Sequence, residues 1–159
     1  MQRRDFLKHS VAGLMAGSAL GARSAFAYEV TKSDADWKKQ LSPAAYDVLR
    51  HEGTEVPFTS PLNNEHRKGI FACAGCALDL FSSDTKFDSG TGWPSFYRPL
   101  ENAVGTKTDT TLGMTRTEVH CRRCGGHLGH VFDDGPKPTG LRYCMNGVAM
   151  SFKPSAKQV

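Results

Sequence analysis

Apolar residues recur at two different spacings along the chain, and the spacing changes near residue 53. Residues 31–53 carry apolar side chains at helical spacing, and three of them share one face: Ala45, Tyr46 and Leu49. Ser42-Pro43 is typical of an N-cap followed by a first helical residue. Gly53 is well placed to end the helix. This pattern predicts a helical N-terminal arm over residues 31–53.

After residue 53 the apolar residues alternate in short runs, which is typical of β-strands. The runs fall at residues 69–72, 114–121, 127–132, 141–145 and 148–152. Turn-forming sequences separate several of them, at residues 88–90, 111–113 and 133–136. We therefore expect the helical arm to pack on a mainly antiparallel β domain.

The first 27 residues differ from the rest of the chain and are typical of an export signal. Arg3-Arg4 and a following Phe-Leu-Lys precede a short apolar stretch, Val11–Leu20, and Ala25-Phe26-Ala27 forms a small-x-small cleavage site. The apolar stretch is short and contains glycine, which disfavours a membrane-spanning helix. We expect residues 1–27 to be a twin-arginine signal peptide and residues 28–159 a single periplasmic domain without stable membrane insertion. The alternatives are a membrane anchor or a first helix of the domain.

Composition and charge narrow the classes of function. The 159 residues suffice for one domain, and 39% hydrophobic with 23% charged residues is typical of soluble globular proteins. Arg3, Arg4, Lys8 and Arg23 against Asp5 account for three of the four net positive charges. The remaining chain is nearly neutral, so the sequence lacks the basic surface of a nucleic-acid-binding protein.

Four of the five cysteines form two pairs, Cys73-Ala74-Gly75-Cys76 and Cys121-Arg122-Arg123-Cys124. Four thiolates are a ligand set that structural zinc takes in a closed tetrahedral site. The separation of the pairs exceeds that of a compact zinc ribbon, so we place them on different hairpins clamped by one ion. Two disulfides or a redox-active Cys-x-x-Cys are the alternatives. Twin-arginine export favours zinc, because thiols stay reduced while the protein folds in the cytoplasm.

The fifth cysteine, Cys144, lies in a predicted strand near several residues suited to chemistry. His127 and His130 are three residues apart in one predicted strand, so alternation points them to opposite faces, and one of them could be a partner for Cys144. Trp93 lies on a glycine-flanked turn, a form suited to an exposed binding wall. The structural alternative is that Cys144 is a small buried hydrophobe and that these residues belong to the core.

Three motifs, in order, give the chain a resemblance to a known family. They are Gly92-Trp93-Pro94-Ser95-Phe96, the run Cys121–Pro136 (CRRCGGHLGHVFDDGP) and Arg142-Tyr143-Cys144-Met145-Asn146. Together they resemble the B-type methionine sulfoxide reductases, and the similarity extends from about Trp37 to Phe152. The resemblance implies a mainly β fold of two antiparallel sheets splayed like a tent over a shared core. A short helical N-terminal arm and a structural zinc site at one end complete this expected fold.

The resemblance also implies an activity, the thiol-dependent reduction of methionine R-sulfoxide in peptides and proteins. Cys144 matches the nucleophile, which becomes a sulfenic acid, and His130 matches the residue that polarises or protonates the sulfoxide oxygen. Asn146 matches a residue that positions this network. Trp93 matches the indole that packs against the substrate methyl group, and His127 matches a supporting residue of the binding region.

One departure from the family pattern concerns the regeneration of Cys144. Many relatives carry a second, resolving cysteine in the tryptophan turn, where this chain has Thr91. We therefore expect a one-cysteine variant regenerated by an external thiol, from a thioredoxin-like protein, a glutaredoxin-like protein or a small thiol. We expect the protein to be a monomer.

Three other functions compete with the reductase interpretation. A zinc-stapled binding module would not need Cys144 for its function. A zinc-dependent thiol enzyme acting on glutathione adducts would need an additional open metal site, for which the sequence has no spare ligand cluster. The near-neutral charge of the domain and the export signal both argue against a zinc-ribbon protein that binds nucleic acid.

Overall fold

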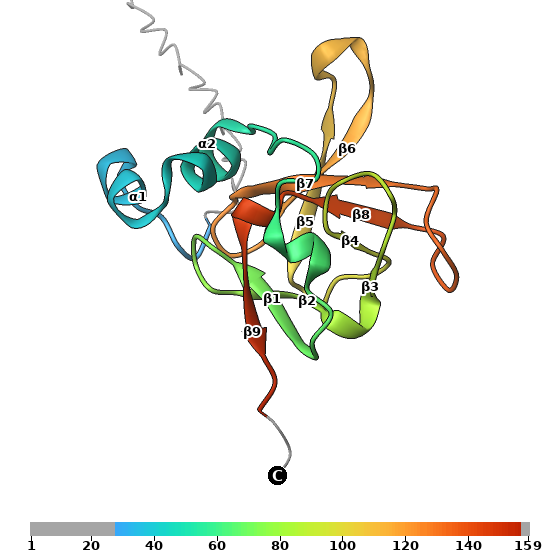
Figure 1. Cartoon of the computed structure of the whole chain (residues 1–159). Coiled ribbons are helices and arrows are strands. Elements are labelled where there is room, and N and C mark those ends of the chain that lie inside the picture. The colour runs from blue at the N-terminus through green and yellow to red at the C-terminus, as the bar shows by residue number, and fades with distance from the viewer. Residues whose placement is uncertain (1–27, 157–159) are drawn as a thin grey trace, which may run out of the picture.

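The computed structural model describes residues 28–156, and the expected signal peptide therefore lies outside the described residues. Within residues 28–156 the chain forms two short α-helices followed by nine strands, with four 3-10 turns before and between the strands (Figure 1). Their bounds are α1 Asp34–Gln40, α2 Pro43–His51, β1 Gly69–Cys73, β2 Asp79–Ser82, β3 Lys86–Phe87, β4 Ser95–Phe96, β5 Val104–Asp109, β6 Arg116–Cys121, β7 His127–Phe132, β8 Arg142–Met145 and β9 Met150–Pro154. No helix between residues 28 and 156 has the length and apolar character needed to cross a bilayer.

The strands form two antiparallel sheets, which confirms the expected fold class. The smaller sheet has the order β2-β1-β9 and the larger has the order β3-β4-β8-β7-β6-β5. An aromatic cluster joins them, because Phe96 of the larger sheet stacks on Phe81 of the smaller at 4.4 Å between ring centroids and meets Phe71 edge-on at 5.0 Å. All three rings are fully buried, so the shared core lies between the sheets.

The N-terminal arm is helical, as expected over residues 31–53, and it consists of two helices that are divided at Ser42. Ser42 has extended backbone angles, and its hydroxyl accepts a hydrogen bond from the Ala45 amide as the N-cap of α2. Pro43 follows it, and proline disfavours helical angles in the residue that precedes it. The helix therefore starts again at Pro43, as the Ser-Pro signal indicates, and Glu52 ends it in the left-handed region before Gly53.

The helices pack against the end of the sheets that carries the cysteine pairs. Trp37 of α1 and Leu49 of α2 are buried, and Arg50 donates a hydrogen bond to the Cys124 carbonyl at 3.2 Å. A Cβ on Gly126 would approach Leu49 to 2.7 Å, so the missing side chain lets α2 lie close to the β6–β7 turn. Figure 1 shows α2 beside this end of β7.

A bulge in β7 changes which way its histidines point. Val119 pairs with Gly129, but the next residue of β6, His120, pairs with His127, so β7 contains one extra residue here. The extra residue resets the alternation of side chains, and the rings of His127 and His130 lie 5.4 Å apart. The expectation that these histidines face opposite sides of the sheet is therefore wrong.

Candidate active site and metal site

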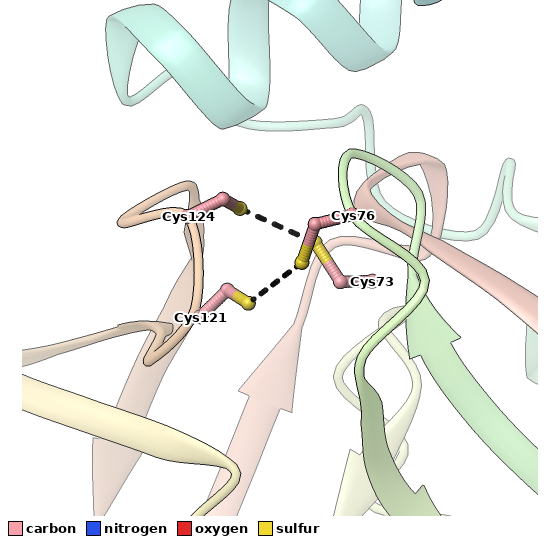
Figure 2. A group of neighbouring side chains, drawn as sticks. All are labelled: Cys73, Cys76, Cys121 and Cys124. Atoms are coloured by element: carbon pink, nitrogen blue, oxygen red, sulfur yellow. Dashed lines mark hydrogen bonds between the residues drawn. The ribbon is translucent and has the colours of Figure 1, made fainter. Parts of the chain in front are cut away.

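The two cysteine pairs meet at one point, although they belong to different sheets (Figure 2). Cys73 and Cys76 lie on the β1–β2 turn, and Cys121 and Cys124 lie on the β6–β7 turn. Each turn has a left-handed residue directly after its second cysteine, Ala77 in one and Gly125 in the other. From the sequence, only Gly125 could be expected to adopt this left-handed conformation.

The four sulfurs have a spacing that suits one metal ion. All lie within 4.8 Å of one another, with Cys73 Sγ 3.7 Å from Cys124 Sγ and Cys76 Sγ 3.5 Å from Cys121 Sγ. A tetrahedral zinc with Zn–S bonds of about 2.3 Å would separate its sulfurs by about 3.8 Å. All four cysteines are free thiols, so the geometry is that of a metal site rather than of two disulfides.

The thiols also perturb one another electrostatically, as expected of a metal-ligand cluster. Hydrogen bonds from the other three thiols lower the pKa of Cys76, and the same mutual contacts raise the pKa of Cys73. A divalent cation that binds here would displace the thiol protons, because metal-bound cysteine is a thiolate. The donors and their spacing therefore fit a closed four-sulfur metal site.

Away from the cysteine cluster, strand register places Cys144 in a row of polar residues across the larger sheet. Cys144 of β8 pairs with Ser95 of β4 on one side and with His130 of β7 on the other. Directly paired residues in antiparallel strands project their side chains to the same face, with Cβ atoms about 5 Å apart. The row continues across β6 at Glu118, which pairs with His130. The fold therefore brings Cys144 and His130 together from segments separated in the sequence.

A pocket of about 180 Å³ opens over this row. Its lining combines a thiol, an imidazole, an amide and a guanidinium with an aromatic wall, and consists of Thr54, Trp93, Arg116, Gly129, His130, Phe132, Cys144 and Asn146. Four of the five residues for which the sequence analysis proposed a catalytic or binding role therefore share one cavity. The fifth, His127, is buried next to His130 and is 3% exposed.

The tryptophan turn forms one side of the pocket. The Trp93 indole donates a hydrogen bond to the Glu55 carbonyl at 2.9 Å, which fixes the orientation of the ring. Gly92 has a φ of +92°, and a Cβ there would lie 2.8 Å from the Phe58 amide nitrogen, so the close approach of the two loops requires glycine. In the same turn the Thr91 hydroxyl lies 3.6 Å from Cys144 Sγ. Position 91 is therefore directly beside the thiol.

Asn146 is held on both sides by the backbone. Its amide nitrogen donates to the Leu128 carbonyl at 3.0 Å, and its side-chain oxygen accepts from the Glu55 amide at 2.8 Å. The Glu55 carboxylate accepts a hydrogen bond from the Gly147 amide at 2.7 Å, and burial raises the pKa of this carboxyl. The loop at Glu55 thus ties Trp93 and Asn146 into one rigid wall of the pocket.

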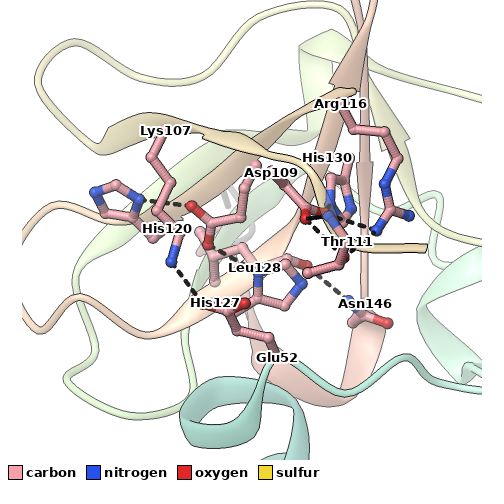
Figure 3. A network of polar contacts seen from close by, with 11 residues as sticks. Glu52, Lys107, Asp109, Thr111, Arg116, His120, His127, Leu128, His130 and Asn146 are labelled. Carbon is pink, nitrogen blue, oxygen red and sulfur yellow. Dashed lines mark hydrogen bonds and ion pairs between the residues drawn. The ribbon is translucent and has the colours of Figure 1, made fainter. Parts of the chain in front are cut away.

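His130 is bound to a carboxylate that the sequence analysis did not identify (Figure 3). His130 Nε2 lies 2.7 Å from Asp109 Oδ2, and Arg116 Nη2 lies 2.7 Å from the same oxygen. The Thr111 amide and hydroxyl donate to the other oxygen, Oδ1, at 2.9 and 2.7 Å. These hydrogen bonds, led by those from Thr111, hold the pKa of Asp109 well below its usual range. Burial lowers the pKa of His130, and Asp109 opposes that shift.

A second carboxylate, Glu118, lies buried beneath the site. It is 2% exposed, and its two oxygens meet His127 Nδ1 at 2.8 Å and His120 Nδ1 at 2.9 Å. Burial alone would raise the pKa of Glu118, but the two imidazoles more than offset this effect, and the pKa falls to about 2. This carboxylate therefore fixes the ring of His127, against which His130 packs edge-on.

The residues that sequence analysis missed share one feature, a charge inside a predicted strand or beside a turn. Asp109 and Arg116 pair across the end of the β5–β6 hairpin, on either side of the Thr-Leu-Gly turn, and Glu118 interrupts the run at 114–121. A charged residue within a predicted strand is a signal for a buried ion pair, and this signal was available. The role of the loop at Glu55 had no comparable signal, because its contacts run through backbone atoms.

Comparison with known proteins agrees with this geometry. A family model described as the SelR domain matches residues 41–154. The peptide methionine sulfoxide reductase MsrB of Agrobacterium fabrum is 58% identical over 127 residues, covering 79% of this chain and 94% of that protein. The MsrB of Leptospira interrogans is 57% identical over 127 residues (79% and 97%), and that of Methanosarcina barkeri is 57% identical over 125 residues (78% and 88%). The chain therefore belongs to the SelR-domain family, that of the peptide methionine sulfoxide reductases MsrB.

Proposed function

We propose that this chain, a methionine sulfoxide reductase by family, reduces methionine R-sulfoxide in peptides and proteins through a sulfenic acid on Cys144. The observation that carries the proposal is the cross-strand pair of Cys144 and His130 at the base of the pocket beside Trp93. A thiol and an imidazole side by side can supply both a sulfur nucleophile and a proton.

The reaction conserves atoms and electrons within the enzyme and its substrate. The Cys144 sulfur attacks the sulfoxide sulfur and forms an S–S bond, while the S–O bond breaks and the oxygen departs with the thiol proton as hydroxide. The hydroxide then adds to the Cys144 sulfur and the S–S bond breaks, which releases methionine and leaves a sulfenic acid on Cys144. The substrate sulfur gains two electrons and the cysteine sulfur loses two. His130 polarises or protonates the oxygen, directly or through water, and Asn146 positions this network.

The wall of the pocket supports a role in substrate binding. Trp93 is half-buried with its ring held by Glu55, so it offers a fixed aromatic surface for the methyl group of the substrate. His127 contributes from behind by holding the ring of His130 in place. Selection of the R epimer would follow from the methyl group lying against Trp93 while the oxygen points to His130.

We further propose that Cys144 is regenerated by an external thiol. Thr91 occupies the position beside Cys144 where many relatives have a resolving cysteine, and its hydroxyl cannot form a disulfide. The other four cysteines face one another in the metal site. A thioredoxin-like protein, a glutaredoxin-like protein or a small thiol would supply the two electrons.

The proposed metal is a single structural zinc ion held by Cys73, Cys76, Cys121 and Cys124. Four thiolates at this spacing suit zinc, and a closed site would stabilise the fold without offering an open position for chemistry. The two turns belong to different sheets, so the ion would clamp the sheets together.

The proposed location is the periplasm, reached through a twin-arginine signal in residues 1–27 that is then removed, with the product acting as a monomer. What supports it is the order of charged, apolar and small residues in this segment, which lies outside the SelR match at residues 41–154. N-terminal sequencing of the exported protein should begin at Tyr28, and Arg3→Lys with Arg4→Lys should keep it in the cytoplasm. An unprocessed protein of full length in the periplasm would contradict the proposed cleavage.

The reductase proposal is tested by Cys144→Ser. This variant should fold and bind metal as before, but should lose reduction of methionine R-sulfoxide with dithiothreitol as the reductant, by about 10³-fold or more. Asp84→Asn, a substitution at an exposed position of the turn that follows β2 in the other sheet, serves as the control and should keep full activity. Retention of activity by Cys144→Ser would contradict the role of this thiol.

A further inference from the structure

Asp109 hydrogen bonds with His130, and the proposed reaction assigns no role to this contact. Its Oδ2 hydrogen bonds with both His130 Nε2 and Arg116 Nη2. Its Oδ1 accepts hydrogen bonds from the Thr111 amide and hydroxyl. The Asp109 side chain is 8% exposed, so this arrangement is largely shielded from water. Such a buried, fully paired carboxylate is a fixed element rather than a surface ion pair.

The charge of Asp109 determines which nitrogen of His130 carries the proton. A carboxylate that already accepts hydrogen bonds from an arginine and a threonine is ionised, and an ionised carboxylate only accepts hydrogen bonds. The contact at 2.7 Å therefore requires a hydrogen on His130 Nε2. In the neutral imidazole, Nδ1 is then the nitrogen with the free lone pair.

The second nitrogen of His130 is open to the pocket. Nδ1 forms no hydrogen bond with the part of the chain that the structure describes, and it is not sealed in the interior. Within residues 28–156 the only buried side-chain nitrogen or oxygen without a partner is Arg116 Nε. His130 lines the pocket and is the cross-strand partner of Cys144, so its imidazole and the thiol border the same cavity.

We propose that Asp109, itself held by Arg116, is a positioning residue that makes His130 Nδ1 the acceptor for the Cys144 thiol proton, which His130 then returns to the sulfoxide oxygen. This inference rests on the proposed reductase function. A single proton is transferred twice: it leaves the thiol as the Cys144 sulfur attacks the substrate sulfur, and His130 delivers it to the oxygen as the S–O bond breaks. It remains on that oxygen in the sulfenic acid. No other acid is consumed, and His130 finishes neutral, as it started.

The strands on both sides of His130 carry charged or titratable groups on the same face of the sheet. They are Asp109 and Lys107 of β5, Arg116 and Glu118 of β6, His127 of β7, and Arg142 and Cys144 of β8. Burial lowers the pKa of His130, Arg116 and His127 lower it further, and Asp109 raises it. Loss of Asp109 and loss of Arg116 should therefore shift this pKa in opposite directions, which a merely structural role would not produce.

The test is the pH dependence of the single-turnover rate of sulfenic acid formation. Asp109→Asn should lower the rate at neutral pH by about 10- to 100-fold and move the acid limb to lower pH, because the asparagine no longer favours the imidazolium. Arg116→Met should move the acid limb to higher pH, and Asp109→Glu should recover part of the rate. Asp79→Asn, which removes a carboxylate paired with Lys153 on the smaller sheet, should change neither.

A measurement on the unmutated protein keeps the inference testable if Asp109→Asn does not fold. The ¹⁵N chemical shifts of His130 should show a protonated Nε2 and an unprotonated Nδ1 at neutral pH. The opposite tautomer, or an Asp109→Asn variant with unchanged rate and acid limb, would overturn the inference while leaving the reductase function intact. Absence of sulfoxide reduction by the unmutated protein would instead contradict the proposed function itself.

Discussion

At the scale of single residues, the site depends on which side chains lie against Cys144. Ser95 and His130 flank it across the strands, and Thr91 approaches its sulfur from the tryptophan turn. Arg142 lies two residues before Cys144 in the same strand and donates a hydrogen bond to Asp134 at 2.8 Å. The Asp134 carboxylate, together with the nearby Cys144 thiol, raises the pKa of the Arg142 guanidinium. The guanidinium therefore places a permanent positive charge two residues from the thiol.

The absence of a resolving cysteine leads to a prediction about Thr91. In Thr91→Cys a second thiol replaces a hydroxyl that lies 3.6 Å from Cys144 Sγ, within reach of a disulfide after small side-chain movements. One turnover without external reductant should then consume two thiols, whereas the unmutated protein should keep a sulfenic acid that dimedone can trap. Thiol titration and mass spectrometry would measure this difference.

Ser155→Cys is the matched control for that experiment. Ser155 is exposed and follows β9 of the smaller sheet, so a cysteine there should leave the sulfenic acid on Cys144 available to dimedone. Equal loss of two thiols in Ser155→Cys and Thr91→Cys would contradict the assignment of position 91 as the resolving position.

At the scale of secondary structure elements, the sequence predicted five of the nine strands between residues 28 and 156. Alternation and turn residues indicated β1, β6, β7, β8 and β9, whereas β2, β3, β4 and β5 were not predicted. The bulge that turns His127 and His130 to one side was not predicted either, because the apolar pattern of β7 does not mark the extra residue. The Asp109–His130 contact depends on that register, and it could not be predicted before the strand pairing was known.

The close contact between β7 and β8 gives a prediction for Gly129. A Cβ at this position would lie 2.1 Å from the Cys144 carbonyl oxygen, so Gly129→Ala must push the two strands apart. We expect a loss of about 2–4 kcal/mol in the free energy of unfolding, measured by urea denaturation, together with a loss of activity because Cys144 moves away from His130.

Gly140→Ala is the control that separates the effect of a steric clash from the effect of backbone strain. Gly140 has a φ of +73° with no atom near its hypothetical Cβ, so alanine there should cost only about 1 kcal/mol and leave activity unchanged. If both variants lost the same stability, the steric account of the β7–β8 contact would be wrong.

At the scale of the whole molecule, the cysteine cluster joins the two sheets at the end covered by the helices. The sequence predicted the four ligands because Cys-x-x-Cys pairs have a recognisable spacing, and it placed the pairs on different hairpins. It did not indicate that α2 covers the cluster through Arg50, since that contact uses the carbonyl of Cys124. Backbone contacts between distant segments have no sequence signature.

Metal removal should therefore weaken the whole fold rather than the site alone. The purified protein should contain one zinc ion, and its removal by a chelator or by Cys76→Ser should cost about 5 kcal/mol or more. At about 3–5 °C per kcal/mol for a chain of this size, the midpoint of thermal unfolding should fall by about 15 °C or more. Elemental analysis and calorimetry would measure both quantities. A metal-free protein that is folded, equally stable and has five reactive thiols would contradict the proposal that a metal ion holds the two sheets together.

The proposed reaction, reduction of methionine R-sulfoxide by Cys144 without a resolving cysteine, can be tested in a single turnover. Residues 28–159 would be given the separated epimers of N-acetyl methionine sulfoxide amide without added thiol, and Cys144 would then be titrated. We expect about one methionine per protein from the R epimer alone, with a sulfenic acid trapped on Cys144. No methionine from a folded, metal-loaded sample, or equal reduction of both epimers, would overturn the proposed reaction.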